Sequence, residues 1–209
     1  SSEYPSLERL KFLSFVSANL DEFFEIRVAG LMQQVDSNLE QHNLNAFSTK
    51  ELLSLVLKET HQLVVDQYNC WKNQLLPVLK KENIIFKTPN ELTKSEDEWL
   101  EKYFQDEIFP VLTPLAIDSL HPFPQITNKA LYILVLLKEN EQDDKTRLAI
   151  IPVPRILPRV FSLPSNHPTS SYIFLSDLLR KYAYKLFPGL HVTGAWEFRI
   201  TRNSDLYIN

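Results

Sequence analysis

The sequence predicts an α+β protein, in which a bundle of about three helices is followed by a mixed α/β domain with a small, largely antiparallel sheet. In the first hundred residues, apolar side chains recur every three or four positions, as on one face of a helix. After residue 130 they come in runs of strand length. Of the 13 prolines only two precede residue 88, and the net charge is −7 for residues 1–108 but +3 for residues 109–209. We therefore predict two domains, 1–106 and 107–209.

The first helix is expected over about residues 6–37, where apolar residues recur at steps of three and four, and it contains Gly30. Glycine in a helix interior costs about 1 kcal/mol relative to alanine, and close approach of another backbone is one reason to keep it. The apolar stripe consists of Leu10, Leu13, Val16 or Ser17, Leu20, Phe24, Leu31 and Val35.

Two more helices are expected before residue 108. Ser48 and Glu51 have the spacing of a capping box, so a helix should start there and continue to about residue 82, with a kink near Pro77. A third helix is predicted over 93–107, with an inward side formed by Trp99, Leu100, Tyr103 and Phe104.

The rear of the chain is predicted to mix strands with one helix. Apolar runs at 130–137 and 147–153 flank a charged turn and should form a hairpin. Residues 175–186 are predicted to form a helix that Ser176 caps. Further strands are expected at 159–163, 172–174 and 191–201. The chain then ends at Asn209 without a closing element, so the second domain is expected to be incomplete there.

Several functional classes are disfavoured by composition. Only Gly30, Gly189 and Gly194 are present, so neither a Walker nor a Rossmann phosphate loop can form. The single cysteine, Cys70, predicts a reducing compartment and an inert thiol. No secretory signal or apolar run of membrane-spanning length occurs, and a net charge of −4 argues against a nucleic-acid partner.

No catalytic or metal-ligating residue is predicted. The histidines are dispersed and none lies in an H-E-x-x-H or H-x-K pattern; His121 is interpreted as ordering a proline-rich loop. The five are His42, His61, His121, His167 and His191. A basic set in the rear could bind phosphate oxygens or form an ordinary charged surface. It consists of Arg155, Arg159, Arg180, Lys181, Lys185, Arg199 and Arg202.

The densest polar segment surrounds Asn19, which shares a helical face with Phe15, Phe23 and Ile26. An amide beside aromatic rings suits a planar heterocycle, because rings stack on its faces while the amide hydrogen-bonds its edge. From these residues alone, the alternative that Asn19 lies on an ordinary solvated helix face remains open.

Several motifs together resemble bacterial polyphosphate kinase of the phospholipase-D-like family. They are LERLKFL at 7–13, SANLDEFF at 17–24, RVAGL at 27–31, PVLTPLAID at 110–118, HPFP at 121–124, IPVP at 151–154, PRVFSLP at 158–164 and FRITRN at 198–203. These motifs follow the family order over nearly the whole chain.

The resemblance implies the N-terminal and head domains of an enzyme that transfers the terminal phosphate of ATP to inorganic polyphosphate. It implies that Asn19 contacts ATP and that the head domain forms a homo-oligomer. The family's phosphohistidine and its Mg²⁺-linked arginines match no segment here, so these 209 residues alone are expected to be inactive. A cytoplasmic location is expected, with peripheral attachment to the inner membrane an option for the full-length enzyme. The alternative is a non-catalytic dimerisation or interaction module. The resemblance leaves the domain boundary open between about 83 and 110, and it leaves the roles of Arg199 and Arg202 open.

Overall fold

The computed structural model describes residues 4–37, 47–117, 124–140, 145–164 and 169–203. They form two compact units. One ends at Leu79 and also takes in residues 201–203; the other spans Lys80–Ile200. The domain boundary predicted between residues 106 and 107 stays a prediction; the division into compact units lies earlier in the chain. No helix among the described residues is both long and apolar enough to cross a membrane.

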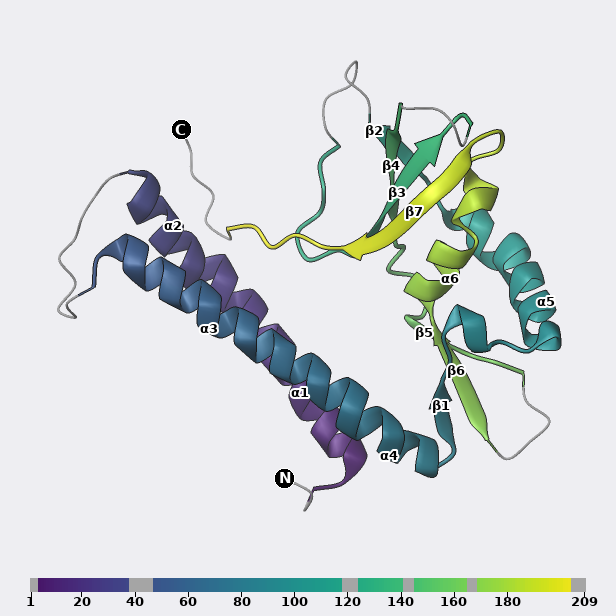
Figure 1. Cartoon of the computed structure of the whole chain (residues 1–209), viewed down its shortest axis with the longest axis horizontal. Helices are drawn as coiled ribbons and strands as arrows, with labels where there is room; N and C mark the ends of the chain where they lie inside the picture. Colours follow the sequence, from purple (N-terminus) through teal and green to yellow (C-terminus); the bar gives the residue numbers. More distant parts are fainter. Residues whose placement is uncertain (1–3, 38–46, 118–123, 141–144, 165–168, 204–209) are drawn as a thin grey trace. The chain divides into compact units, whose positions relative to one another are not determined.

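The first unit is built from two long, interrupted helices that run side by side (Figure 1). The helix predicted over 6–37 is confirmed, as α1 (Ser6–Phe23), a π-helical turn η1 (Phe24–Val28) and α2 (Ala29–Asp36). The second comprises α3 (Thr49–Cys70), the π-helical turn η2 (Trp71–Leu75) and α4 (Leu76–Lys81).

The predicted capping box at the start of α3 is confirmed. The Glu51 amide donates to the Ser48 hydroxyl (3.3 Å), and the Ser48 amide donates back to a Glu51 carboxylate oxygen (2.8 Å). At the other end the helix widens into η2 just before Pro77. Proline has no N–H and its ring crowds the carbonyl four residues earlier, so a wider turn suits this position.

The second unit contains two sheets and several short helices. A four-stranded antiparallel sheet has the order β2-β4-β3-β7, from β2 (Leu115–Ile117), β3 (Tyr132–Lys138), β4 (Arg147–Pro152) and β7 (His191–Phe198). A three-stranded sheet has the order β1-β6-β5, from β1 (Ile84–Phe86), β5 (Val160–Ser162) and β6 (Ser170–Phe174). Strands β1 and β6 are parallel, whereas β5 and β6 are antiparallel. The predicted fold class and the β3–β4 hairpin are thus confirmed.

The helical parts of this unit differ in detail from expectation. Helix α5 (Lys94–Tyr103) and the π-helical η4 (Phe104–Ile108) cover the predicted third helix, and the 3₁₀ turns η3 (Pro89–Glu91) and η5 (Phe109–Val111) flank them. The helix predicted over 175–186 is only α6 (Leu175–Lys181), followed by the 3₁₀ turn η6 (Ala183–Leu186). The cap expected from Ser176 is wrong, because Phe174 occupies the N-cap position and no side chain caps the helix.

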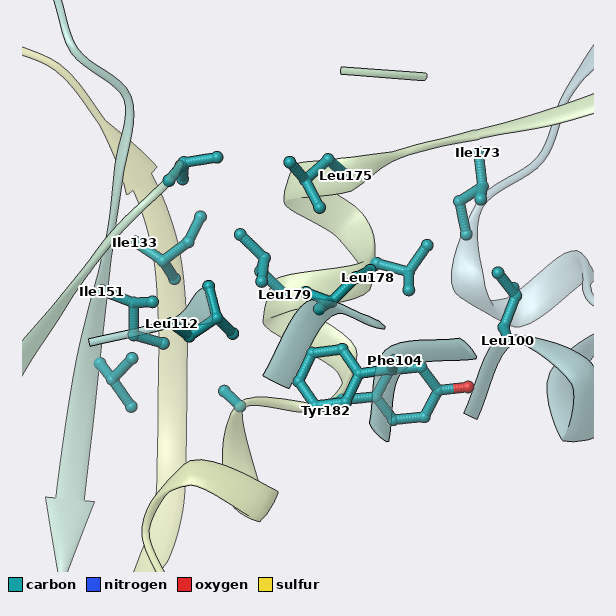
Figure 2. Packing of buried hydrophobic residues seen from close by; sticks show 14 of the residues in the cluster. Leu100, Phe104, Leu112, Ile133, Ile151, Ile173, Leu175, Leu178, Leu179 and Tyr182 are labelled. Carbon is teal, nitrogen blue, oxygen red and sulfur yellow. The ribbon is translucent and has the colours of Figure 1, made fainter. Parts of the chain in front are cut away.

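The core of the second unit is centred on α6. Its leucines, Leu175, Leu178 and Leu179, lie between sheet residues such as Ile133 and helix residues such as Phe104, and all five are fully buried (Figure 2).

Two residues, one in each unit, depart from expectation. Trp99 was predicted to point inward but is 38% exposed, and it stacks on Tyr103 with ring centroids 5.3 Å apart. Beside Gly30, an added Cβ would meet no described atom within 4 Å, so the close approach suggested for that glycine is wrong for the described residues.

Candidate functional site

The outer face of α1 carries aromatic rings beside an exposed amide. Steps of three and four residues place Phe12, Phe15 and Asn19 on one side of the helix. Asn19 is exposed, and Phe12 and Phe15 are 56% and 50% exposed. The structure therefore presents the predicted amide and one of its predicted rings, Phe15, to solvent. The other two predicted neighbours differ in exposure: Ile26 is 48% exposed, whereas Phe23 is half-buried.

Two further rings extend this face. Phe12 lies edge-on to Phe15, with centroids 6.1 Å apart, and Tyr4 lies edge-on to Phe12 at 6.4 Å. The sequence analysis missed both. The seven-residue spacing from Phe12 to Asn19 could have identified Phe12, whereas Tyr4 precedes the helix and obeys no helical spacing. We call Tyr4, Phe12, Phe15 and Asn19 the aromatic-amide face.

The turn after this face is π-helical and contains a buried carboxyl group. Glu25, in η1, is only 9% exposed, and both Glu25 and Asp21 have interaction partners in the structure. Single π turns inside α-helices occur frequently at functional sites, because the extra residue re-aims the side chains around it.

The opposite side of α1 faces α3. A cleft of about 260 Å³ lies there, lined by residues that include Leu13, Ser17, Gln67 and Trp71 but not Asn19. The Gln67 amide donates to the Leu13 carbonyl (2.7 Å) and to the Ser17 hydroxyl (2.6 Å). These bonds hold α1 against α3, so this side of the helix is structural, whereas the aromatic-amide face takes no part in these contacts.

Three members of the predicted basic set are engaged by carboxylates. Lys181 Nζ lies 3.0 Å from an Asp97 oxygen, and Lys185 Nζ lies 2.5 Å from a Glu101 oxygen. Arg180 lies between Asp177 and Glu197, at 3.5 and 3.6 Å. Of the others, Arg199 and Arg202 also have interaction partners, while Arg155 and Arg159 are exposed. The described pairs favour a structural role for the lysines.

Asp97 shows how these pairs support the fold. Burial alone would raise the pKa of its carboxyl group, but hydrogen bonds from Tyr182 (2.6 Å) and Lys181 outweigh that effect, and the pKa is lowered. The pKa of the Tyr182 hydroxyl is raised, first by burial and then by its bond to Asp97. At neutral pH the Asp97 carboxyl group is therefore ionised and the Tyr182 hydroxyl keeps its proton. The hydrogen bond between them then links α5 to the end of α6.

The described residues contain no group of three or more His, Cys, Asp or Glu side chains placed to hold a metal. His61 and His191 are exposed and far apart in the chain, while His42, His121 and His167 lie outside the described residues. Cys70 is half-buried rather than in the core, beside Arg9 and Gln74.

Comparison with known proteins gives one consistent result. Residues 1–87 match the model of the polyphosphate kinase N-terminal domain, and residues 95–209 match that of the polyphosphate kinase middle domain. The chain is 44% identical over 209 residues to a polyphosphate kinase of Bacillus cereus, covering 98% of this chain and 30% of the relative. It is 41% identical to a polyphosphate kinase of Pseudomonas aeruginosa, and that match covers 99% of this chain and 30% of the relative.

A crystal structure of polyphosphate kinase from Porphyromonas gingivalis has the same fold. It superposes with a TM-score of 0.84 at 28% identity, covering 97% of this chain and 30% of that chain. The chain thus spans about 30% of the length of the proteins it matches.

Proposed function

Because the chain belongs to the polyphosphate kinase family, we propose that the full-length protein transfers the terminal phosphate of ATP to inorganic polyphosphate. The transfer runs through a phosphohistidine, which divides one difficult step into two easier ones. In this proposal the phosphohistidine and the Mg²⁺ ligands lie outside these 209 residues, and the enzyme works in the cytoplasm. These residues contribute a contact to the base of ATP and a surface for self-association.

The exposed aromatic-amide face is the observation that carries the nucleotide contact. The Asn19 side chain offers both a donor and an acceptor, which match the edge of a purine. Phe12 and Phe15 offer half-exposed rings on the same side of α1, and ring stacking on a base adds about 1–3 kcal/mol. Unlike Gln67 on the opposite side, Asn19 has no hydrogen bond to any described residue that would compete with a ligand.

We predict that Asn19→Ala in the full-length enzyme raises KM for ATP about fivefold, because one hydrogen bond of about 1 kcal/mol is lost. Steady-state kinetics with varied ATP and saturating polyphosphate measure this. Asn69→Ala is the matched control, since Asn69 is an exposed helical asparagine of the same unit. Unchanged ATP kinetics in Asn19→Ala, or an equal change in both variants, would refute the contact.

A purely structural role is the second candidate, and a specific surface favours it. Strand register places Leu115, Leu148 and Trp196 on one face of the four-stranded sheet, and they are 38%, 37% and 51% exposed. Exposed apolar side chains gathered on one sheet face are typical of protein contacts. If sedimentation shows that the 209-residue chain dimerises while ATP leaves the amide signals near Asn19 unchanged, the assembly role describes this part of the protein better.

A further inference from the structure

The second unit contains a concave site that the proposed function does not use. It is a cavity of about 800 Å³ that is open on one side and lined by Tyr184, residues 187–193 and Lys138 at the end of β3. The Phe187 carbonyl accepts from the Leu190 amide (3.1 Å), and Gly189 adopts φ +81° between them. This left-handed turn folds the chain back into β7 and forms one wall of the cavity. The volume is within the range of small-molecule sites, about 300–1,000 Å³.

The charge of this cavity has one sign. Its lining includes Lys138 and His191, which are register partners at the ends of β3 and β7, and it includes no Asp or Glu. Neither side chain has an ion pair with any described residue. Glu139, which follows Lys138 in the sequence, is paired with Arg147, and Glu101 is paired with Lys185. An anion entering the cavity would therefore meet two donors that no described carboxylate pairs with.

The same cavity presents aromatic surface. Tyr184 is 52% exposed, and Phe187 is half-buried beside it in the lining. Lys185 Nζ stands 6.0 Å from the centre of the Tyr184 ring, which leaves the other side of that ring to a ligand. The cavity therefore combines an aromatic ring, on which a base can stack, with two basic side chains, which can bind an anion. A nucleotide requires both.

We propose that this cavity binds a nucleotide, with the base against Tyr184 and the phosphates between Lys138 and His191. The lining residues of this cavity belong to the second unit, whereas Asn19 belongs to the first. The cavity contains no nucleophile or metal-ligand cluster among the described residues, so it is a binding site, not a catalytic one.

The experiment follows the amide NMR signals of the full 209-residue chain during titration with magnesium-free ATP. We expect saturable shifts at residues 189–193 that persist in Asn19→Ala, so the two contacts can fail independently. Lys138→Gln and His191→Gln should each weaken this binding at least fivefold, whereas Lys102→Gln, an exposed lysine of the same unit, should not. Tyr184→Leu should weaken it while Tyr184→Phe retains it, and unshifted amides in β3 report intact folding.

Three results would overturn the proposal. The first is the absence of saturable shifts at 189–193 in the wild-type chain. The second is an equal loss in Lys102→Gln, which indicates general charge attraction instead of a site. The third is inorganic tripolyphosphate binding as tightly as ATP with no effect of Tyr184→Leu, which excludes recognition of a base.

Discussion

The two units of this protein bury their apolar side chains to very different extents. Helix α1 contains no buried residue, and large apolar side chains such as Leu7, Phe12 and Phe15 are at least half exposed. The second unit instead encloses a continuous core of 18 buried residues, including Phe104. In the first unit, the described apolar residues that are buried are Val28, Leu75 and Leu79, so its long helices depend more on local signals than on a large core. The difference also means that the exposed rings of α1 can be replaced at little cost in stability, so their contribution to binding can be measured separately.

The largest effect should come from one matched pair of truncations. Phe104→Ala removes a fully buried ring and should destabilise the second unit by about 3–5 kcal/mol, because a cavity remains. Phe12→Ala, at a 56% exposed ring, should change stability by less than about 1 kcal/mol. Residue-resolved hydrogen exchange is the appropriate measurement, since two units need not unfold together. Equal losses would show that α1 is as tightly packed as the core.

A smaller effect is expected at a buried ion pair. Lys87 Nζ lies 2.7 Å from a Glu96 oxygen, with side chains only 17% and 10% exposed. Burial alone would raise the pKa of Glu96, but bonds from Lys87 and Thr93 lower it below its usual 4.5. Glu96→Gln should cost the second unit about 2 kcal/mol at pH 7, because a charged hydrogen bond is lost.

The same group predicts a dependence on pH. Because the folded-state pKa of Glu96 is lowered, its stabilisation is complete above pH 4.5 and is lost as pH falls through the folded value. Asp97 acts in the same direction, whereas Asp177, whose pKa is raised by burial and Glu197, acts in the opposite one. Acid unfolding of the second unit should therefore become less steep in Glu96→Gln. An unchanged acid profile would contradict the assignment.

The smallest effect belongs to a local signal in the first unit. Ser48→Ala removes the N-cap of α3 and should destabilise its first turn by about 1 kcal/mol. Ser54→Ala, at an exposed position inside the same helix, should have no destabilising effect, since alanine is the best helix former. Hydrogen-exchange rates of the backbone amides in the first turn of α3 distinguish the two variants. A cost at Ser54 equal to that at Ser48 would mean that capping is not the cause.

The candidate site was predictable only in part. The spacing of Phe15 and Asn19 on α1 was readable from the sequence, because a helix repeats every 3.6 residues. The cavity beside Tyr184 was not, since it depends on the turn at Gly189 and on the pairing of Lys138 with His191 across two strands. The engagement of Lys181 by Asp97 likewise joins residues far apart in the chain.

By itself, the sequence determined the two long helices of the first unit, the start of α3 and the β3–β4 hairpin, because caps, turns and apolar periodicity act between near neighbours. Only the tertiary structure decided that β1 pairs in parallel with β6 and that the apolar side of α5 faces the core around α6. The three-residue strands β1 and β2 were not predicted, because strands so short carry little periodic signal. Their partners are selected by packing between distant segments, which no local pattern encodes.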